Sequence, residues 1–383
     1  MGDSGGHMNA SPADITLPAD LRPTDGRFGS GPSKVRAEAL AALVATGPTY
    51  LGTSHRQSPV RSVVGRLRAG MADLFALPDG YEVVFGNGGA AYFWDVAVSS
   101  LIRRRSQHLN FGNFSESFTM AVANAPHLDA PDVIESPAGT HPETTPNPDV
   151  DAYAITQNET STGVAMDVRR PVPAEEGLVL VDATSAAGGM LVDPTQFDVY
   201  YFSPQKGFGA DGGLWIAICS PAALARVAEI KAGGRWIPES LSLATAVDNA
   251  RLDQTYNTPG LATLFLMNDQ LEWILANGGL AWAAARSATS TGILYDWAEA
   301  SAFATPFVAN PADRSPVVAT IDFDAAVDAT AVNKALRANG IVDTEPYRRL
   351  GRNQLRVAVY PSVDPDDVTR LTGAIDYVVA ALS

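Results

Sequence analysis

Short, uninterrupted apolar runs recur along the chain, and a turn or helix signal bounds each of them. The runs are His108–Phe111, Tyr153–Gln157, Leu178–Thr184 and Val199–Ser203. A strand with one face in water alternates apolar and polar residues, whereas a continuous apolar run is typical of a strand buried on both faces. The pattern therefore predicts a sheet with helices on both sides.

Helical patterns lie between these strands. Lys34–Gly47 and Arg61–Gly80 place alanine, leucine and valine at helical spacing and end at glycine. Tyr81–Arg104 combines a short strand, a glycine turn and a helix, and Ser136–Asp151 reads as a proline-rich, acidic surface loop. The alternation predicts an α/β fold whose mostly parallel, helix-covered sheet forms a large domain.

The pattern changes near Leu271. From there the chain reads as a helix, a strand at Val317–Phe323, a helix, a strand at Leu355–Pro361 and a final helix. This order predicts a smaller α+β domain. We therefore expect an N-terminal arm (1–26), a large domain (27–270) and a small C-terminal domain (271–383).

Composition narrows the classes of protein. The 383 residues are 46% hydrophobic and 18% charged, as in a globular protein with a substantial core. No apolar run approaches the roughly 20 residues that span a bilayer, and the polar start has no apolar region typical of a signal peptide. The one cysteine, Cys219, excludes an intramolecular disulfide framework and favours a cytoplasmic location. We expect no membrane association.

The formal net charge is −15, which argues against nucleic acid as a partner because phosphate backbones recruit basic surfaces. An anionic small molecule would need a local positive site built from a few arginines.

Asp182 and Lys206 are the first candidates for chemistry. Asp182 ends the apolar run Leu178–Thr184, and Lys206 follows Val199–Ser203. In an open α/β sheet, ligands bind outside the carboxyl ends of the strands, so the two side chains can face one pocket. A lysine amine can hold an aldehyde cofactor, and a carboxylate can keep a pyridine nitrogen protonated. Alternatively, Asp182 caps a helix and Lys206 lies in a solvated loop.

Three further segments have a functional and an ordinary interpretation. Gly86–Ala91 ("GNGGAA") lies between a strand and a helix, where backbone N–H groups can bind phosphate, although many glycine turns bind nothing. Asn158–Gly163 ("NETSTG") offers hydroxyls at a strand end or forms a capped turn. Tyr256–Gly260 ("YNTPG") is also compatible with the start of a helix.

Taken together, these segments resemble the phosphoserine aminotransferases, which are pyridoxal-phosphate enzymes of aminotransferase fold type I. The matching pieces, in family order, are "GTSHRQ", "GNGGA", "NETSTG", "VDATSAAGG", "SPQKGFG", "YNTP" and "LRVAVYP". The resemblance begins at "RFGSGPSKV" (Arg27–Val35), covers nearly the whole chain and is greatest to the actinobacterial branch.

The resemblance implies a binding site for pyridoxal 5'-phosphate and no metal. Lys206 would form the Schiff base and Asp182 would pair with the pyridine nitrogen. Phe114 would stack on the ring where relatives commonly have tryptophan, with Phe111 as the alternative. The other implied cofactor contacts are Gly89, Ala90 and Gln205 at the phosphate, Thr160 at the phenolic oxygen or phosphate side, and Asn257 and Thr258 at a neighbouring subunit's phosphate.

The resemblance also implies the substrate contacts. His55 and Arg56 match a pair near the substrate phosphate, and Arg356 matches the arginine that binds the α-carboxylate. The chain departs from the family before Arg356, because many relatives have His-Arg where this chain has Tyr347, Arg348 and Arg349. Either Arg348 or Arg349 would then meet the phosphate.

The implied activity is transfer of an amino group from L-glutamate to 3-phosphohydroxypyruvate in L-serine biosynthesis, by a homodimer with shared sites. A second use is on a phosphorylated, threonine-like precursor of pyridoxal phosphate. The alternatives are an alanine–glyoxylate aminotransferase, a cysteine desulfurase, a non-catalytic cofactor-binding protein and a nicotinamide enzyme. Cys219 in the apolar strand "GLWIAIC" disfavours the desulfurase, and the incomplete G-x-G-x-x-G spacing disfavours the nicotinamide enzyme.

Overall fold

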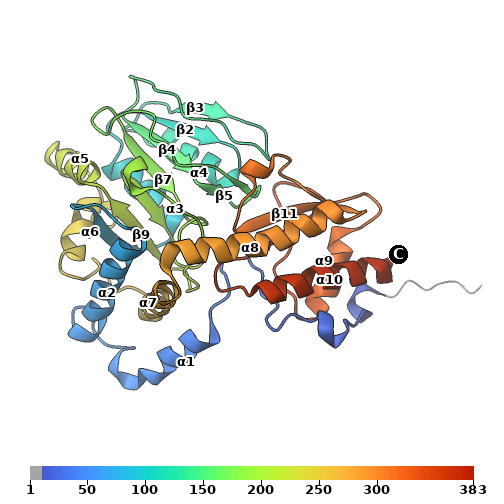
Figure 1. Cartoon of the computed structure of the whole chain (residues 1–383). Coiled ribbons are helices and arrows are strands. Elements are labelled where there is room, and N and C mark those ends of the chain that lie inside the picture. The colour runs from blue at the N-terminus through green and yellow to red at the C-terminus, as the bar shows by residue number, and fades with distance from the viewer. Residues whose placement is uncertain (1–10) are drawn as a thin grey trace, which may run out of the picture.

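The computed structural model describes residues 11–383, and its largest element is a seven-stranded sheet (Figure 1). The strand order is β1-β9-β8-β7-β4-β2-β3. The pairs from β8 to β3 are parallel, and β9 alone runs against its two neighbours. The strands are β1 (Glu82–Asn87), β2 (Ser106–Asn110), β3 (Asp132–Glu135), β4 (Ala152–Thr156), β7 (Leu178–Asp182), β8 (Val199–Phe202) and β9 (Leu214–Cys219). The predicted mostly parallel α/β sheet is confirmed.

Helices cover both faces of this sheet, which explains the uninterrupted apolar runs. Val179 and Val181 of β7 join one hydrophobic core with α2 (Ser58–Leu74) and α7 (Leu261–Ala276). Leu180, between them, joins the opposite core. The helices on that side are α3 (Ala90–Ser100), α5 (Pro221–Ala232) and α6 (Leu243–Ala250), with part of α4 (Asn113–Ala123). Helix α1 (Ala37–Ala45) packs on α7.

A three-stranded antiparallel sheet forms the smaller C-terminal unit. Its strands are β10 (Ala304–Pro306), β11 (Val318–Phe323) and β12 (Gln354–Ala358), and its helices are α9 (Ala329–Ala338) and α10 (Pro365–Leu382). Helix α8 (Gly279–Ala300) joins the two units, because Leu280 packs in the large core and Leu294 in the small one (Figure 1). A two-stranded ribbon, β5 (Asn158–Glu159) and β6 (Val164–Ala165), follows β4.

The N-terminal segment packs on the C-terminal unit. Ile15, Leu17 and Phe28 lie in the small core, and the Leu17 N–H donates to Asn339 Oδ1 at 2.9 Å. Residues 1–10 of the expected arm lie outside the described residues. The domain limits at 26 and 270 stay predictions. Among the helices within 11–383, none is long and apolar enough to cross a membrane.

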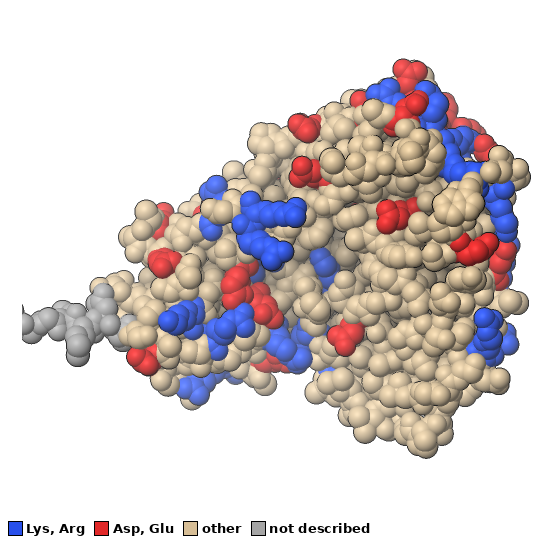
Figure 2. Space-filling model, turned by 180° about the vertical axis from the view of Figure 1, so that it is seen from behind, with Lys and Arg blue, Asp and Glu red and all other residues tan. Residues whose placement is uncertain are grey.

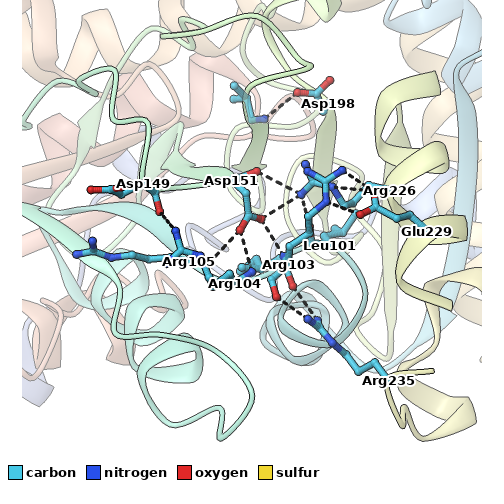
Figure 3. A network of polar contacts seen from close by, with 12 residues as sticks. Leu101, Arg103, Arg104, Arg105, Asp149, Asp151, Asp198, Arg226, Glu229 and Arg235 are labelled. Atoms are coloured by element: carbon cyan, nitrogen blue, oxygen red, sulfur yellow. Dashed lines mark hydrogen bonds and ion pairs between the residues drawn. The ribbon is translucent and has the colours of Figure 1, made fainter. Parts of the chain in front are cut away.

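A network of polar contacts joins the amino ends of the parallel strands (Figure 3). Asp151, just before β4, accepts hydrogen bonds from the backbone N–H groups of Arg103, Arg104 and Arg105 at 2.8, 2.8 and 3.1 Å. It also forms an ion pair with Arg226 of α5 at 3.1 Å, and the Arg226 side chain is only 3% exposed. One carboxylate therefore ties the loop after α3, the start of β4 and helix α5 together.

We predict that Asp151→Asn lowers the free energy of unfolding by about 2–3 kcal/mol, because a nearly buried arginine loses its charged partner. Denaturant unfolding monitored by circular dichroism measures the change. Asp129→Asn is the control, since Asp129 pairs with Arg104 through a side chain that is 55% exposed, and its loss should cost less than about 1 kcal/mol. Equal losses in the two variants would contradict this account.

Candidate active site

The carboxyl ends of β7 and β8 open onto a cavity of about 450 Å³. Asp182 is the last residue of β7, and Lys206 follows β8; both side chains line the cavity. Arg356 of β12 lines it as well, so the C-terminal unit forms part of its wall. The cavity therefore lies where the two sheets approach each other, and it contains the expected Asp182–Lys206 pair.

Lys206 is buried, with 7% of its surface exposed. Its Nζ donates to Thr160 Oγ1 at 3.0 Å and lies 5.3 Å from the centre of the Phe114 ring. Burial lowers the Lys206 pKa to about 8, while Asp182 opposes this shift and Arg356 adds to it. An amine with such a pKa is partly neutral near physiological pH, so it can act as a nucleophile or a base.

The backbone beside Lys206 has no room for a side chain. At Gly31, φ is +139° and an added Cβ would lie 2.9 Å from Lys206 Cε. Glycine at this position therefore allows the lysine its place in the cavity.

Two donors orient the Asp182 carboxylate. Trp94 Nε1–H donates to Oδ2 at 3.1 Å, and the Thr184 backbone N–H donates to Oδ1 at 2.9 Å. The carboxylate is thereby held in place at the cavity wall, where it can bind a protonated ring nitrogen. Sequence reasoning missed Trp94; the only signal was an aromatic residue one turn into the helix after the glycine turn.

Phe114 and Phe111, the two candidates for the stacking ring, lie in different places. Phe114 lines the cavity, close to Lys206 and to the ring of Tyr347. Phe111 is 2% exposed and packs against the His141 ring on the other side of this segment. Of the two, only Phe114 lines the cavity that contains Lys206 and Asp182.

A buried carboxylate holds the backbone that carries Phe114. Glu159 is fully buried; its Oε2 accepts from the N–H groups of Phe114 and Ser115 at 3.0 and 2.9 Å. Its Oε1 accepts from the Ser161 N–H at 3.2 Å and hydroxyl at 2.7 Å. Burial raises the Glu159 pKa, and these hydrogen bonds work against the rise. The sequence motif contained Glu159, but its role in fixing α4 was not predicted.

Gly89 and Ala90 also line the cavity, at the start of α3. The first N–H groups of a helix have no partner within the helix, and they favour an anion. An added Cβ at Gly89 would lie 3.6 Å from Ser203 Oγ, and Gln205 lines the same cavity. Ser203 and Gln205 each have a buried side-chain oxygen with no hydrogen-bond partner in the described residues. These groups suit a phosphate.

The donor set as a whole fits pyridoxal phosphate: an amine for its aldehyde, a carboxylate for its ring nitrogen, an aromatic ring for its face and helix N–H groups for its phosphate.

Arg356 contributes a positive charge to the cavity wall. Its Nη1 donates to the Thr160 carbonyl at 3.3 Å, and its guanidinium lies 5.2 Å from the centre of the Tyr347 ring. Its Nε is buried and has no partner among residues 11–383. A guanidinium with a free donor at the cavity wall suits a carboxylate.

Four predicted residues lie outside this cavity and gather elsewhere. They are His55, Arg56, Asn257 and Thr258, and none of them lines the cavity in the described chain. Thr258 Oγ1 lies 3.1 Å from His55 Nδ1, and the Thr258 carbonyl accepts from Asn87 Nδ2 at 2.8 Å. Asn87 precedes the Gly88–Gly89 turn, so the group lies next to the turn that contains Gly89. Arg56, Asn257 and Thr258 are exposed, whereas His55 is buried.

Arg348 and Arg349 are both exposed and do not line the Lys206 cavity. Arg349 Nη1 donates to Asn113 Oδ1 at 2.7 Å and lines an adjoining cavity of about 360 Å³. Tyr347 lines both cavities. Within the described part of the chain, Arg348 has no hydrogen bond or ion pair.

Charge is unevenly distributed over the surface. Figure 2 shows Lys and Arg side chains beside a hollow on one face, although the formal net charge is −15. A net negative charge thus leaves room for a local basic site. No group of three or more His, Cys, Asp or Glu residues in 11–383 is arranged to hold a metal ion.

Comparison with known proteins gives consistent matches. Residues 137–344 match the family model "Aminotransferase class-V". A phosphoserine aminotransferase of Rhodococcus jostii is 58% identical over 366 residues, which is 96% of this chain and 98% of that protein. A protein of Mycolicibacterium paratuberculosis is 60% identical, covering 96% of this chain and 98% of its own.

Solved structures agree on the fold. A phosphoserine aminotransferase of Cytophaga hutchinsonii has a TM-score of 0.85 at 21% identity, covering 92% of this chain and 99% of that one. An aspartate aminotransferase of Thermus thermophilus has a TM-score of 0.78 at 23% identity, covering 93% and 99%. The fold is therefore shared by enzymes with different substrates.

The fold, the lysine–aspartate site and the family match make the chain a pyridoxal-phosphate-dependent aminotransferase of class V. Within that class, the near full-length matches at 58–60% identity assign it to the phosphoserine aminotransferase family.

Proposed function

We propose that this protein transfers the amino group of L-glutamate to 3-phosphohydroxypyruvate, giving O-phospho-L-serine and 2-oxoglutarate in L-serine biosynthesis. One observation carries the assignment: this chain, which is 58% identical to a phosphoserine aminotransferase over 96% of its length, has Lys206, Asp182 and Arg356 around one cavity. A phosphorylated, threonine-like substrate in pyridoxal phosphate biosynthesis offers the same carboxylate and phosphate, so we include it in the proposal.

The chain's own residues divide the work. Bound pyridoxal phosphate supplies an aldehyde for amines and a pyridine ring that takes up electrons. Asp182, oriented by Trp94, would hold a proton at the ring nitrogen, and Phe114 would pack on the ring face. Lys206, with a pKa of about 8, would take a proton from the substrate Cα and deliver it to the aldehyde carbon of the cofactor. Arg356 binds the α-carboxylate.

We further propose that the active unit is a homodimer. The cluster of Asn257, Thr258, His55 and Arg56, of which all but His55 are exposed, would complete the partner's site and meet the phosphates. Apolar side chains beside it in sequence support this, since Leu51, Leu252 and Tyr256 are 43%, 55% and 42% exposed. Arg349, or Arg348, would add to the phosphate contacts from the adjoining cavity. The single, buried Cys219 supports a reducing, cytoplasmic setting.

The substrate assignment predicts distinct behaviour of two arginine variants. Rapid mixing of the cofactor-loaded protein with glutamate, phosphoserine or alanine, followed by absorbance, gives a specificity constant for each donor. Wild type should prefer glutamate and phosphoserine. Arg356→Ala should slow all three donors by roughly ten- to a hundredfold, because each has an α-carboxylate and a charged hydrogen bond contributes about 1.5–3 kcal/mol. Arg56→Ala should slow the two doubly anionic donors only.

Wild type that favours alanine over phosphoserine would instead support an alanine–glyoxylate aminotransferase. If Arg56→Ala slowed alanine as much as phosphoserine, Arg56 would be structural and the phosphate site misplaced.

The shared-site proposal predicts complementation. Lys206→Ala chains and chains with both Asn257→Ala and Thr258→Ala should each be inactive, yet a verified heterodimer of the two contains one intact site and should regain about half of the wild-type activity. The control pairs Lys206→Ala with Arg356→Ala; both positions line one cavity of one chain, so neither site is intact. Absence of recovery in the first mixture, or recovery in the control, would rule out shared sites of this composition.

A further inference from the structure

A chain of buried hydrogen bonds runs from Lys206 to Asn158. Lys206 Nζ donates to Thr160 Oγ1 at 3.0 Å, and Thr160 Oγ1 donates to Ser185 Oγ at 2.8 Å. Ser185 Oγ donates to the backbone carbonyl of Asn158 at 2.9 Å and accepts from the side-chain amide Nδ2 of the same residue at 2.8 Å. The three residues beyond Lys206 line the cavity and are at most 3% exposed.

The end groups fix the direction of every hydrogen in this chain. A carbonyl can only accept, so the single hydroxyl hydrogen of Ser185 is taken by the Asn158 carbonyl. Toward Thr160 the Ser185 oxygen can then only accept, so the hydroxyl hydrogen of Thr160 points to Ser185. Rotating the Asn158 amide would offer Ser185 a second oxygen acceptor, and its hydrogen would still go to Asn158. In either case Thr160 presents only lone pairs to Lys206.

We propose that Ser185, held by Asn158, is a positioning residue that keeps the Thr160 hydroxyl turned as an acceptor toward Lys206 Nζ. An acceptor there stabilises the charged form of the amine and fixes the direction in which Nζ points. The inference deepens the proposed function, since it rests on Lys206 being the reactive amine. Ser185 lies three residues after Asp182, in the turn that follows β7. One short segment would therefore supply the Asp182 carboxylate and also set the direction of the Thr160 hydroxyl.

Other charged groups facing Lys206 stay in place when Ser185 is changed. Asp182 of β7 and Glu159 of β5 favour the charged amine, whereas Arg356 of β12 disfavours it. None of these three side chains has a hydrogen bond to Ser185 in the described residues. A change in the Lys206 pKa on substitution of Ser185 would therefore pass through Thr160.

The pKa of Lys206 in the full-length, cofactor-free protein is the direct readout. Acetic anhydride labels neutral amines, and mass spectrometry of the Lys206 peptide across a pH series around 8 gives this pKa. In Ser185→Ala the Thr160 hydrogen is released and can be donated to the neutral amine. We expect the Lys206 pKa to fall by about half a unit to one unit, the size of one hydrogen bond.

A second variant, Thr160→Val, separates this effect from a general loss of packing around the cavity. In Thr160→Val, Ser185→Ala should leave the Lys206 pKa unchanged, because the connecting hydroxyl is absent. Thr184→Ala is the matched control, since the Thr184 hydroxyl is buried in the same turn and has no partner among the described residues; it should not shift the pKa. Ser185→Cys, with a similar shape and a weak donor, serves if Ser185→Ala does not fold and should give an intermediate shift.

An unchanged pKa in Ser185→Ala, or an equal shift in the Thr160→Val background, would overturn the proposal. The readout involves no substrate and no turnover. A wrong substrate assignment would therefore appear in the donor comparison and leave this result unaffected.

Discussion

Burial of the Lys206 amine is the constraint on which the site depends. An ammonium group that leaves water loses hydration, and this loss lowers its pKa to about 8. The group remains tolerable because Asp182 and Glu159 supply negative charge and Thr160 supplies an acceptor. The same burial makes the amine useful, since a lysine in water would hold its proton too firmly to act as a base near neutral pH.

The parallel sheet explains how these groups come together. The carboxyl ends of parallel strands lie at the same end of the sheet, so Asp182 at the end of β7 and Lys206 after β8 are brought together there. At the opposite end of the sheet, Asp151 accepts hydrogen bonds from three backbone N–H groups and pairs with Arg226, which secures the amino ends of β2 and β4. The small sheet adds Arg356 from a different part of the chain. The cavity is thus formed by the carboxyl ends of the large sheet's strands and by a wall that belongs to the C-terminal unit.

Local pattern was enough to predict the large sheet and its reactive pair. Buried strands leave continuous apolar runs, and polar residues at their ends stand out against them. The mostly parallel order followed from the alternation with helices, whereas the reversed β9 had no local signal, because strand direction depends on the connection as a whole. The short β3, β5, β6 and β10 are too brief to leave a distinctive pattern.

Residues that act through distant contacts could not be predicted. Trp94 meets Asp182 across 88 residues, and Glu159 holds the start of α4 from 45 residues away. Ser185 matters only because Asn158 and Thr160 fold onto it. His55 and Arg56 also lie outside the cavity, which their motif did not indicate, whereas Asn257 and Thr258 were expected to serve a neighbouring subunit.

Borohydride reduction of the pyridoxal-phosphate-loaded protein, followed by peptide mapping, tests the central claim most directly. The buried amine at the end of β8 should carry the label, so the account predicts one phosphopyridoxyl group per chain, on Lys206. A group found instead on Lys34, Lys231 or Lys334, the other lysines of the chain, would contradict it.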